Sequence, residues 1–293
     1  MKIKKPYIIN IGLFLLTFIT TTIVGTISYL SFEYYNKQLS TEFIKNYLLK
    51  PENYLLGLYY SLPLLIILFA HEMGHYLMCK KYGIEATLPY FIPAPTLAGT
   101  FGAVIKIKEP FYSKKSLFDV AIAGPLLSFI LSIPILIYGI SMSKIVSGPM
   151  PEGGFGLGEP IIFKIISSLF YKNLPPTTDL LIHPLAFAGW FGILVTAFNL
   201  LPIGQLDGGH ILYAISSKLH KIFSYIIIGF LIISGFLFWQ GWFLWAILIM
   251  LFGTKHPPVY DSFTKLGKNR ITLFILIIIV FILSFTPNPI YIK

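Results

Sequence analysis

The sequence predicts an all-α polytopic membrane protein with about six to seven transmembrane helices and a small membrane-embedded re-entrant β segment. Of its 293 residues, 56% are hydrophobic and only 12% are charged, whereas a soluble globular domain is about 25% charged. The mean hydropathy is +0.77, and the apolar residues form runs comparable to the roughly 20 residues that cross a bilayer. No soluble core could bury this much apolar surface, so the composition indicates a membrane protein.

The positive charge of the chain is distributed as in membrane proteins. The formal net charge is +10, but the Lys residues occur in short clusters between apolar runs, which is typical of charges that fix orientation. A nucleic-acid partner would need a continuous basic face on a soluble module, and we expect none. The single cysteine, Cys79, excludes an intrachain disulfide.

Seven apolar runs predict membrane spans, with boundaries good to a few residues. The first follows a basic N-terminal start but is too long for a signal peptide, so we expect an uncleaved anchor. The sixth and seventh are short, so either could be tilted or re-entrant. The predicted spans are roughly 8–30, 55–79, 117–140, 184–203, 221–238, 240–252 and 271–286.

The positions of the basic residues predict the orientation of these spans. With the N-terminus inside, most of the 22 Lys and Arg residues lie on the cytoplasmic side, as the positive-inside rule requires. We therefore expect a multi-pass protein of the cell membrane with a cytoplasmic N-terminus. A site in the later part of the second span would open on the cytoplasmic side.

The second predicted span contains a metal-binding motif in the run LLIILFAHEMGHYLMC. His71 and His75 are four residues apart, so on a helix both imidazoles lie on one face and can bind one metal ion. Glu72 lies beside them, where it could take a proton from a metal-bound water. A carboxylate and two imidazoles are costly to place in an apolar segment, so they indicate a functional site.

A later segment offers a further metal ligand. A catalytic zinc ion usually takes three protein ligands and a water, and the HExxH motif supplies two. The fourth predicted span continues into NLLPIGQLDGGH, where Pro202 and Gly204 break the helix. Asp207 lies on this irregular turn in an apolar context. It is either the third ligand or only an acid that caps the next helix.

The segment 82–113 differs from both a span and an ordinary loop. It contains four prolines, which forbid a long helix, and Phe101–Lys108 alternates as a strand does. Non-helical backbone at membrane depth is tolerated only against protein or a wet cavity. We therefore expect a re-entrant loop or short sheet against the metal site, with an edge that could pair with an extended peptide. The alternative is an amphiphilic surface loop.

Other residues are given structural interpretations. Ser116 and Asp119 fit a capping box at the start of the third span, and Gly124 suits close helix packing. The loop 141–183 is too short for a typical domain, so we expect no inserted soluble domain. The remaining histidines are expected to be interfacial, except the one after the DGG turn, which lies either beside the metal ligands or, as we favour, on a helix surface. They are His183, His220 and His256, and His210.

The motifs together resemble those of a known family. HEMGH in one span and NLLPIGQLDGGH in a later one resemble the site-2 protease family of intramembrane zinc metalloproteases, in a form without PDZ or CBS domains. GTFGAVIKIKEP and FDVAIAGPLLS resemble the family's membrane-embedded sheet and its central core span. The resemblance covers roughly residues 55–215.

The resemblance implies a division of the chain and roles for particular residues. It implies a three-helix catalytic core within 55–215, preceded by a transmembrane helix and loop at 1–54 and followed by transmembrane helices at 216–293. His71, His75 and Asp207 would bind one zinc ion per chain. Glu72 would be the general base, and Asn199 would contact the substrate or the developing oxyanion.

The expected function is hydrolysis of peptide bonds in single-span transmembrane proteins, near the cytoplasmic side of the lipid bilayer. The sequence gives no indication of oligomeric state. A membrane peptidase that processes prenylated C-termini would need a downstream Glu ligand, and no Glu follows Glu159. The alternative of another class is a membrane metal transporter or zinc-binding sensor that uses the same ligands. Glu72 distinguishes the two, because only hydrolysis needs a base.

Overall fold

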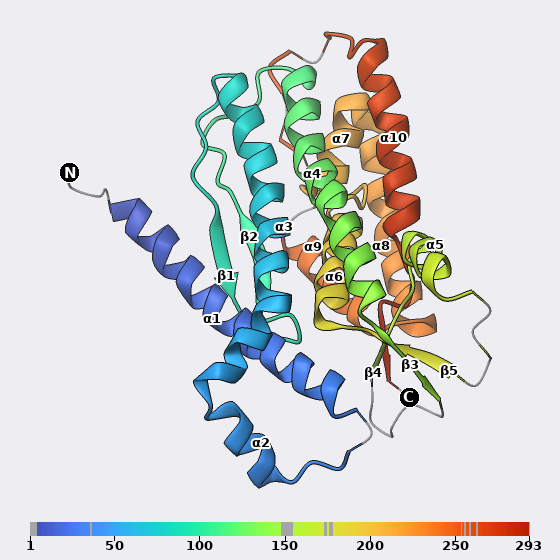
Figure 1. Cartoon of the computed structure of the whole chain (residues 1–293). Helices are drawn as coiled ribbons and strands as arrows, with labels where there is room; N and C mark the ends of the chain where they lie inside the picture. The colour runs from blue at the N-terminus through green and yellow to red at the C-terminus, as the bar shows by residue number, and fades with distance from the viewer. Residues whose placement is uncertain are drawn as a thin grey trace.

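The computed structural model describes residues 5–35, 37–147, 155–172, 175, 178–252, 254, 256, 257, 259–261 and 263–292. Most of them are helical (Figure 1). The helices are α1 (Lys5–Glu33), α2 (Thr41–Leu48), η1 (Pro51–Asn53), α3 (Tyr54–Lys81), α4 (Lys114–Ser141), α5 (Ile161–Phe170), α6 (Pro184–Asn199), α7 (Asp207–Ile215), α8 (Ser217–Leu237), α9 (Gly241–Phe252) and α10 (Lys268–Ser284). The strands are β1 (Tyr90–Pro93), β2 (Thr100–Val104), β3 (Lys144–Ser147), β4 (Phe155–Leu157), β5 (Thr178–Leu181) and β6 (Ile290–Ile292).

Four helices within the described residues are long and apolar enough to cross a membrane. They contain the spans predicted at 8–30, 55–79 and 117–140 and nearly all of that at 221–238. The other three predicted spans fall on α6, α9 and α10, which have 16, 12 and 17 residues. The protein is therefore a mostly helical polytopic membrane protein. Crossings beyond these four stay a prediction, because a span needs roughly 20 apolar residues.

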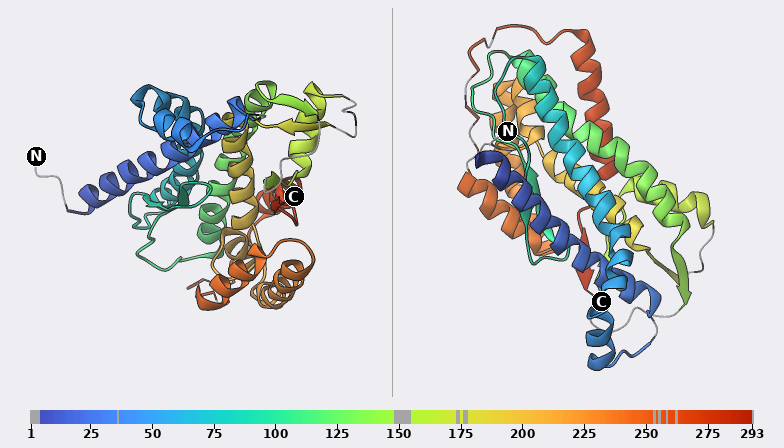
Figure 2. Two further views of the ribbon diagram at one scale, coloured as in Figure 1. Left: turned by 90° about the horizontal axis from the view of Figure 1, so that it is seen from below. Right: turned by 60° about the vertical axis from the view of Figure 1, so that its left-hand side comes forward.

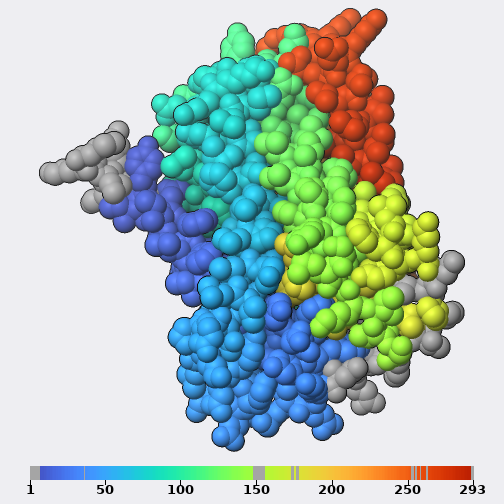
Figure 3. Space-filling model, in the orientation of Figure 1, coloured from blue at the N-terminus to red at the C-terminus, as the bar shows by residue number. Residues whose placement is uncertain are grey.

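The centre of the fold is formed by α4, which packs against α3 on one side and α6 on the other. Small residues let these helices approach closely. A Cβ atom at Gly74 of α3 would lie 2.7 Å from the carbonyl oxygen of Ala123, and one at Gly139 of α4 would lie 2.2 Å from the nitrogen of Ala186. The space-filling view shows α3, α4 and α10 packed side by side along one face (Figure 3). This packing fixes the helices that carry the candidate site.

The segment predicted to be non-helical forms a short antiparallel sheet of β1 and β2. Phe91 pairs with Ala103, and Pro93 pairs with Thr100. The turn between the strands contains Gly99 at φ 75°, a conformation that side-chain-bearing residues rarely adopt. β1 packs against α1 and β2 against α3, so the sheet lies in the angle that opens as α1 diverges from α3 toward its N-terminus (Figures 1 and 2).

Side chains of the two neighbouring helices bind the backbone of this sheet. Asn10 of α1 donates through Nδ2 to the carbonyl oxygen of Pro89 at 2.7 Å. The hydroxyl of Tyr60 on α3, which is fully buried, donates to the carbonyl oxygen of Ala98 at 3.0 Å. These bonds satisfy carbonyl groups that the two-strand ladder leaves unpaired, as buried backbone requires. The sheet is thereby attached to both α1 and α3.

The predicted capping box of Ser116 and Asp119 is wrong. α4 begins one turn earlier, at a box formed by Ser113 and Ser116. Asp119 instead lies inside the helix and accepts two hydrogen bonds from Arg270 of α10, at 2.8 Å from Nε and 2.6 Å from Nη2. The hydroxyl of Tyr82, after α3, donates to the same carboxylate at 2.5 Å. Asp119 therefore joins the ends of three helices.

The opposite end of the molecule is closed by short strand pairs. β3 pairs with β5 and β4 pairs with β6, both antiparallel, at the lower end in Figure 1. Trp190 of α6 is buried and donates through Nε1 to the carbonyl oxygen of Gly158 at 2.7 Å. The part of the loop 141–183 that the structure describes thus packs as strands and α5 against the helices rather than as a separate unit.

Candidate metal centre

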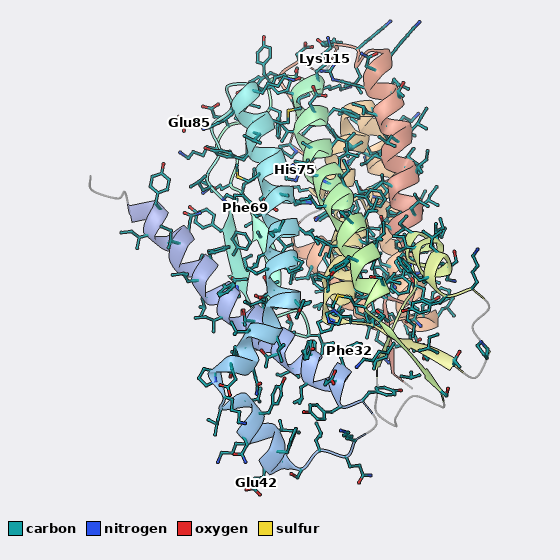
Figure 4. The ribbon with its side chains drawn as sticks, in the orientation of Figure 1. Phe32, Glu42, Phe69, His75, Glu85 and Lys115 are labelled. Atoms are coloured by element: carbon teal, nitrogen blue, oxygen red, sulfur yellow. The ribbon has the colours of Figure 1, made fainter. Side chains whose placement is uncertain are left out.

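Helix α3 brings the two histidines of the HExxH motif together. His71 and His75 lie one turn apart and are 4% and 7% exposed, and their Nε2 atoms are 3.1 Å apart. Figure 4 shows His75 between α3 and α4, nearer the end that carries Glu85 and Lys115 than the end that carries Glu42. The predicted i, i+4 geometry is therefore present and buried among helices.

Asp207 reaches the same point from α7. Its Oδ2 lies 3.2 Å from Nε2 of His71 and 3.4 Å from Nε2 of His75. The N-cap of α7 is Leu206, and it makes no side-chain capping bond, so Asp207 is not the helix cap that was the alternative. The turn needs glycine, because a Cβ atom at Gly208 would lie 2.1 Å from the carbonyl oxygen of Leu200.

The hydrogen bonds behind each imidazole fix its protonation. Nδ1 of His75 lies 2.8 Å from the carbonyl oxygen of Val120, which can only accept, so Nδ1 carries the proton and Nε2 presents a lone pair. Nδ1 of His71 lies 3.2 Å from Oγ of Ser128. The Ser128 hydroxyl also donates to the carbonyl oxygen of Pro125 and lies within hydrogen-bond distance of Oγ1 of Thr196. Because the hydroxyl hydrogen of Ser128 is used in these bonds, the Ser128 oxygen accepts from Nδ1 of His71. Nε2 of His71 therefore presents a lone pair, as Nε2 of His75 does.

The three converging atoms fit a zinc ion. Zinc–nitrogen and zinc–oxygen bonds of about 2.0–2.1 Å in a tetrahedron place ligand atoms about 3.3 Å apart. The observed separations are 3.1, 3.2 and 3.4 Å. Within the described residues no hydrogen-bond donor reaches the buried Oδ2 of Asp207, because the nearby nitrogens of His71 and His75 present lone pairs. Three lone pairs this close repel one another unless a cation lies between them, so the donor set matches the metal.

The predicted catalytic residues line the same cavity. A cavity of about 280 Å³ is bounded by α3, β2, α4, α6 and α7. Glu72, only 7% exposed, and Asn199, the last residue of α6, both lie on its wall. Within the described part of the chain, His71, His75 and Asp207 are the one group of at least three potential ligands close enough to hold a metal. The structure thus brings together all five predicted site residues.

Helix α4 approaches the metal-binding face of α3 at Gly124, where the imidazole of His75 fills the crossing. A Cβ atom at Gly124 would lie 2.2 Å from Nε2 of His75. Only glycine leaves room for the imidazole at this crossing. Gly124, interpreted from the sequence as a general helix-packing residue, therefore determines where the His75 imidazole lies.

The structure contradicts one expectation about a histidine and adds a buried contact for a second. His210 was assigned to the helix surface, but it lines the cavity with Glu72 and Asp207, and its Nδ1 lies 2.7 Å from Nε2 of His256. His220 is 3% exposed, with Nε2 3.0 Å from the carbonyl oxygen of Gly204. The spacing could have indicated His210, because three residues after Asp207 is the same face of a helix. The contact with His256 has no local signal.

Comparison with known proteins places these features in a family. The description "Peptidase family M50" matches residues 59–239. The chain is 32% identical over 244 residues to "Probable zinc metalloprotease EGY2, chloroplastic" of Oryza sativa subsp. indica, covering 80% of this chain and 43% of that protein. It is 30% identical over 234 residues to "Probable zinc metalloprotease EGY1, chloroplastic" of Arabidopsis thaliana, covering 75% and 41%.

A third relative, "Probable zinc metallopeptidase EGY3, chloroplastic" of Arabidopsis thaliana, is 24% identical over 252 residues, covering 76% of this chain and 42% of that protein. The chain therefore spans less than half the length of these relatives. The family match covers more than half of the chain, includes the complete candidate centre, and confirms the resemblance read from the two motifs. The chain belongs to peptidase family M50, the site-2 protease family.

Proposed function

We propose that this protein is an intramembrane zinc metalloendopeptidase that hydrolyses peptide bonds of single-span transmembrane proteins. The convergence of His71, His75 and Asp207 beside Glu72 is the observation that carries the proposal. Two helices long enough to cross a membrane, α3 and α4, contribute to this centre, which supports cleavage within or near the bilayer. The zinc metalloprotease names of the relatives support the same reaction.

The catalytic roles follow from the cavity. His71, His75 and Asp207 would hold one zinc ion per chain, which would polarise the substrate carbonyl and acidify a water molecule. Glu72 takes the proton of the attacking water and returns it to the leaving amine. Asn199, on the same wall, would donate a hydrogen bond to the substrate or to the developing oxyanion. The buried surroundings strengthen each of these interactions, because the effective dielectric constant is low.

The substrate has to be extended where it is cut, because the carbonyl groups of a helix are hydrogen-bonded and shielded. β2 offers a place for such a segment. Its strand partner within the described residues is β1, and Ala103, Val104 and Ile105 line the cavity. An extended substrate would add to this edge of the sheet and carry its bond past Glu72.

The membrane arrangement is also part of the proposal. We place about six to seven spans in the bilayer, with α6, α9 and α10 completing the crossings and with β1 and β2 as a re-entrant segment. The hydrogen bonds that Asn10 and Tyr60 donate to this segment support its burial, since unsatisfied backbone is excluded from the hydrocarbon region.

Charge supports the orientation. Lys80 and Lys81 end α3 and Lys114 and Lys115 begin α4, at the end of the molecule nearer the candidate centre (Figure 4). By the positive-inside rule this end faces the cytoplasm. The relatives are named as chloroplast proteins. For this chain we propose the cell membrane, with the N-terminus and the opening of the active site on the cytoplasmic side.

Cleavage by purified protein tests the function. Wild type and Glu72→Gln would be incubated in detergent with a set of single-span substrates, with and without a zinc chelator, and zinc content would be measured in parallel. We expect cleavage by wild type only, lost in chelator, with zinc retained by the variant. Zinc bound without cleavage of any substrate, together with zinc flux into vesicles that Glu72→Gln leaves intact, would instead support the transporter alternative.

A further inference from the structure

A histidine outside the zinc-binding group faces the same cavity. His210 lies in the first turn of α7, three residues after Asp207. It forms part of the cavity wall with Glu72, and so do Ala103 and Val104 of β2. β2 and α7 are separate elements that contribute to one cavity, so a substrate segment lying on β2 passes α7 as well.

The partner of His210 determines which of its nitrogens carries the proton. Nδ1 of His256 lies 2.5 Å from the carbonyl oxygen of Pro257, which can only accept, so this Nδ1 carries a proton. Nε2 of the neutral His256 ring is therefore an acceptor, and it lies 2.7 Å from Nδ1 of His210. His210 consequently donates through Nδ1 and has no proton on Nε2 when it is neutral.

Both rings are held neutral and in place. Burial lowers the pKa of His210 to about 4 and that of His256 to about 4, so neither is charged near pH 7. The ring of Tyr213 stacks on His256, with 3.9 Å between ring centroids and an angle of 13°. Tyr213 is on α7 itself, so His210 and its partner are fixed to the same short helix. The orientation of His210 is thus set before any substrate arrives.

An extended substrate presents donors that β2 leaves unpaired. The backbone groups of a strand point alternately to its two edges, and a strand that adds to β2 pairs along one edge only. N–H groups on its other edge would be buried in the cavity and need acceptors, because an unpaired buried donor is costly. Nε2 of His210 is an acceptor, and no hydrogen bond occupies it within the part of the chain that the structure describes.

We propose that His210 is a substrate-binding residue whose Nε2 accepts a hydrogen bond from a backbone N–H on the edge of the extended substrate that β2 does not pair. His256 is a positioning residue that holds His210 in the accepting tautomer. The inference rests on the proposed peptidase function and deepens it. It implies that the enzyme forms backbone hydrogen bonds with both edges of the extended substrate segment, one edge through β2 and the other through His210.

Ester substitution in the substrate provides the test. A synthetic single-span peptide would be prepared in a series, each member replacing one backbone N–H near the cleavage site by an ester oxygen. Dissociation constants would be measured on the Glu72→Gln background, and KM and kcat on the active protein. His210→Phe keeps an aromatic ring and removes the acceptor, whereas His210→Gln keeps an acceptor near the position of Nε2.

The expected result is specific to one position of the peptide. His210→Phe should weaken binding by roughly 3- to 10-fold, the effect of one net hydrogen bond, with zinc content and unfolding temperature unchanged. One ester peptide in the series should bind more weakly by a similar factor when residue 210 is histidine. The same ester should cause no further loss of affinity in His210→Phe, which already lacks the acceptor. His210→Gln should recover part of the loss. His256→Phe should reduce the ester effect at the same position, because His210 is then free to adopt the donating tautomer.

Three results would overturn the inference. Ester effects that are equal in wild type and His210→Phe at every position would mean that no substrate N–H meets this nitrogen. A His210→Phe variant that loses zinc or unfolds early, with His210→Gln doing the same, would mean that the residue only supports the fold. A wild type that cuts none of the peptides and binds none of them would remove the peptidase proposal itself, and this inference with it.

Discussion

Substituting Gly124 by alanine should displace a zinc ligand without changing any donor atom. The new Cβ atom would lie 2.2 Å from Nε2 of His75 and 2.6 Å from its Cε1, whereas ordinary contacts begin at 3.4 Å. The imidazole or α4 therefore has to move by more than about 1 Å, and zinc sites tolerate changes of only about 0.2 Å in ligand distance. We expect zinc affinity to fall by roughly 10- to 100-fold, or about 1.4–2.8 kcal/mol.

Competition with a fluorescent zinc chelator at controlled free zinc measures this affinity. Gly229→Ala on α8 is the matched control, because a Cβ atom there meets nothing within 4 Å. It should bind zinc as wild type does and be slightly stabilised by the better helix propensity of alanine. A folded Gly124→Ala protein with wild-type zinc affinity would show that His75 can retreat freely, and would refute the argument that α4 fixes its position.

Three further predictions concern charge and protonation. Arg270→Leu leaves the partly buried Asp119 carboxylate without its cation and should reduce the free energy of unfolding by about 1–3 kcal/mol. The matched control is Lys108→Leu, which breaks the ion pair with Glu85, whose two side chains are 52% and 67% exposed; it should cost less than about 1 kcal/mol. Chemical denaturation that gives equal losses of unfolding free energy for Arg270→Leu and Lys108→Leu would contradict this prediction. Asp207→Asn should fold normally but bind zinc far more weakly, since it removes the anionic ligand, and metal analysis showing full zinc content would argue against the assignment. Burial lowers the pKa of His183 to about 4, so its contribution to stability is complete above pH 6.5 and is lost as the pH falls toward 4, because the unfolded chain then binds the proton first. His183 is the N-cap of α6, where its Nδ1 accepts from the N–H of Leu185. Asn keeps a cap that does not titrate, so the unfolding temperature of His183→Asn should change less than that of wild type between pH 7 and pH 4.5; an equal change would contradict the role of His183 in this pH dependence.

The long spans were predictable because their signals are local. An apolar run and its flanking charges predict α1, α3, α4 and α8 closely. The start of α4 was misassigned because Ser113, Ser116 and Asp119 are evenly spaced, so a capping motif can be read in two registers. The real role of Asp119 depends on Arg270, which is 151 residues away, and no local pattern contains that contact. The pairing of β3 with β5 and of β4 with β6 was missed for the same reason.

The metal-binding group could be predicted almost entirely. The positions of His71 and His75 follow from helix geometry. The residues alone leave Asp207 either as the third ligand or as a helix cap, and the resemblance to the family's second motif favours the ligand. What the sequence did not indicate is how each imidazole is held. Val120 contributes only a backbone carbonyl to His75, and any residue type provides one. His210 was undervalued because its partner His256 comes from a distant loop.

The attachment of the β1–β2 sheet has a mechanical consequence. Asn10 holds the sheet to α1 and Tyr60 holds it to α3, and α1 diverges from α3 with the sheet between them (Figure 2). A displacement of β2 is therefore transmitted through β1 to α1. In the same way, a change in the tilt of α1 shifts the edge of β2 that lies beside Glu72. Events at the outer rim of the protein, such as a change in bilayer thickness that re-tilts α1, would reach the reaction centre through this linkage.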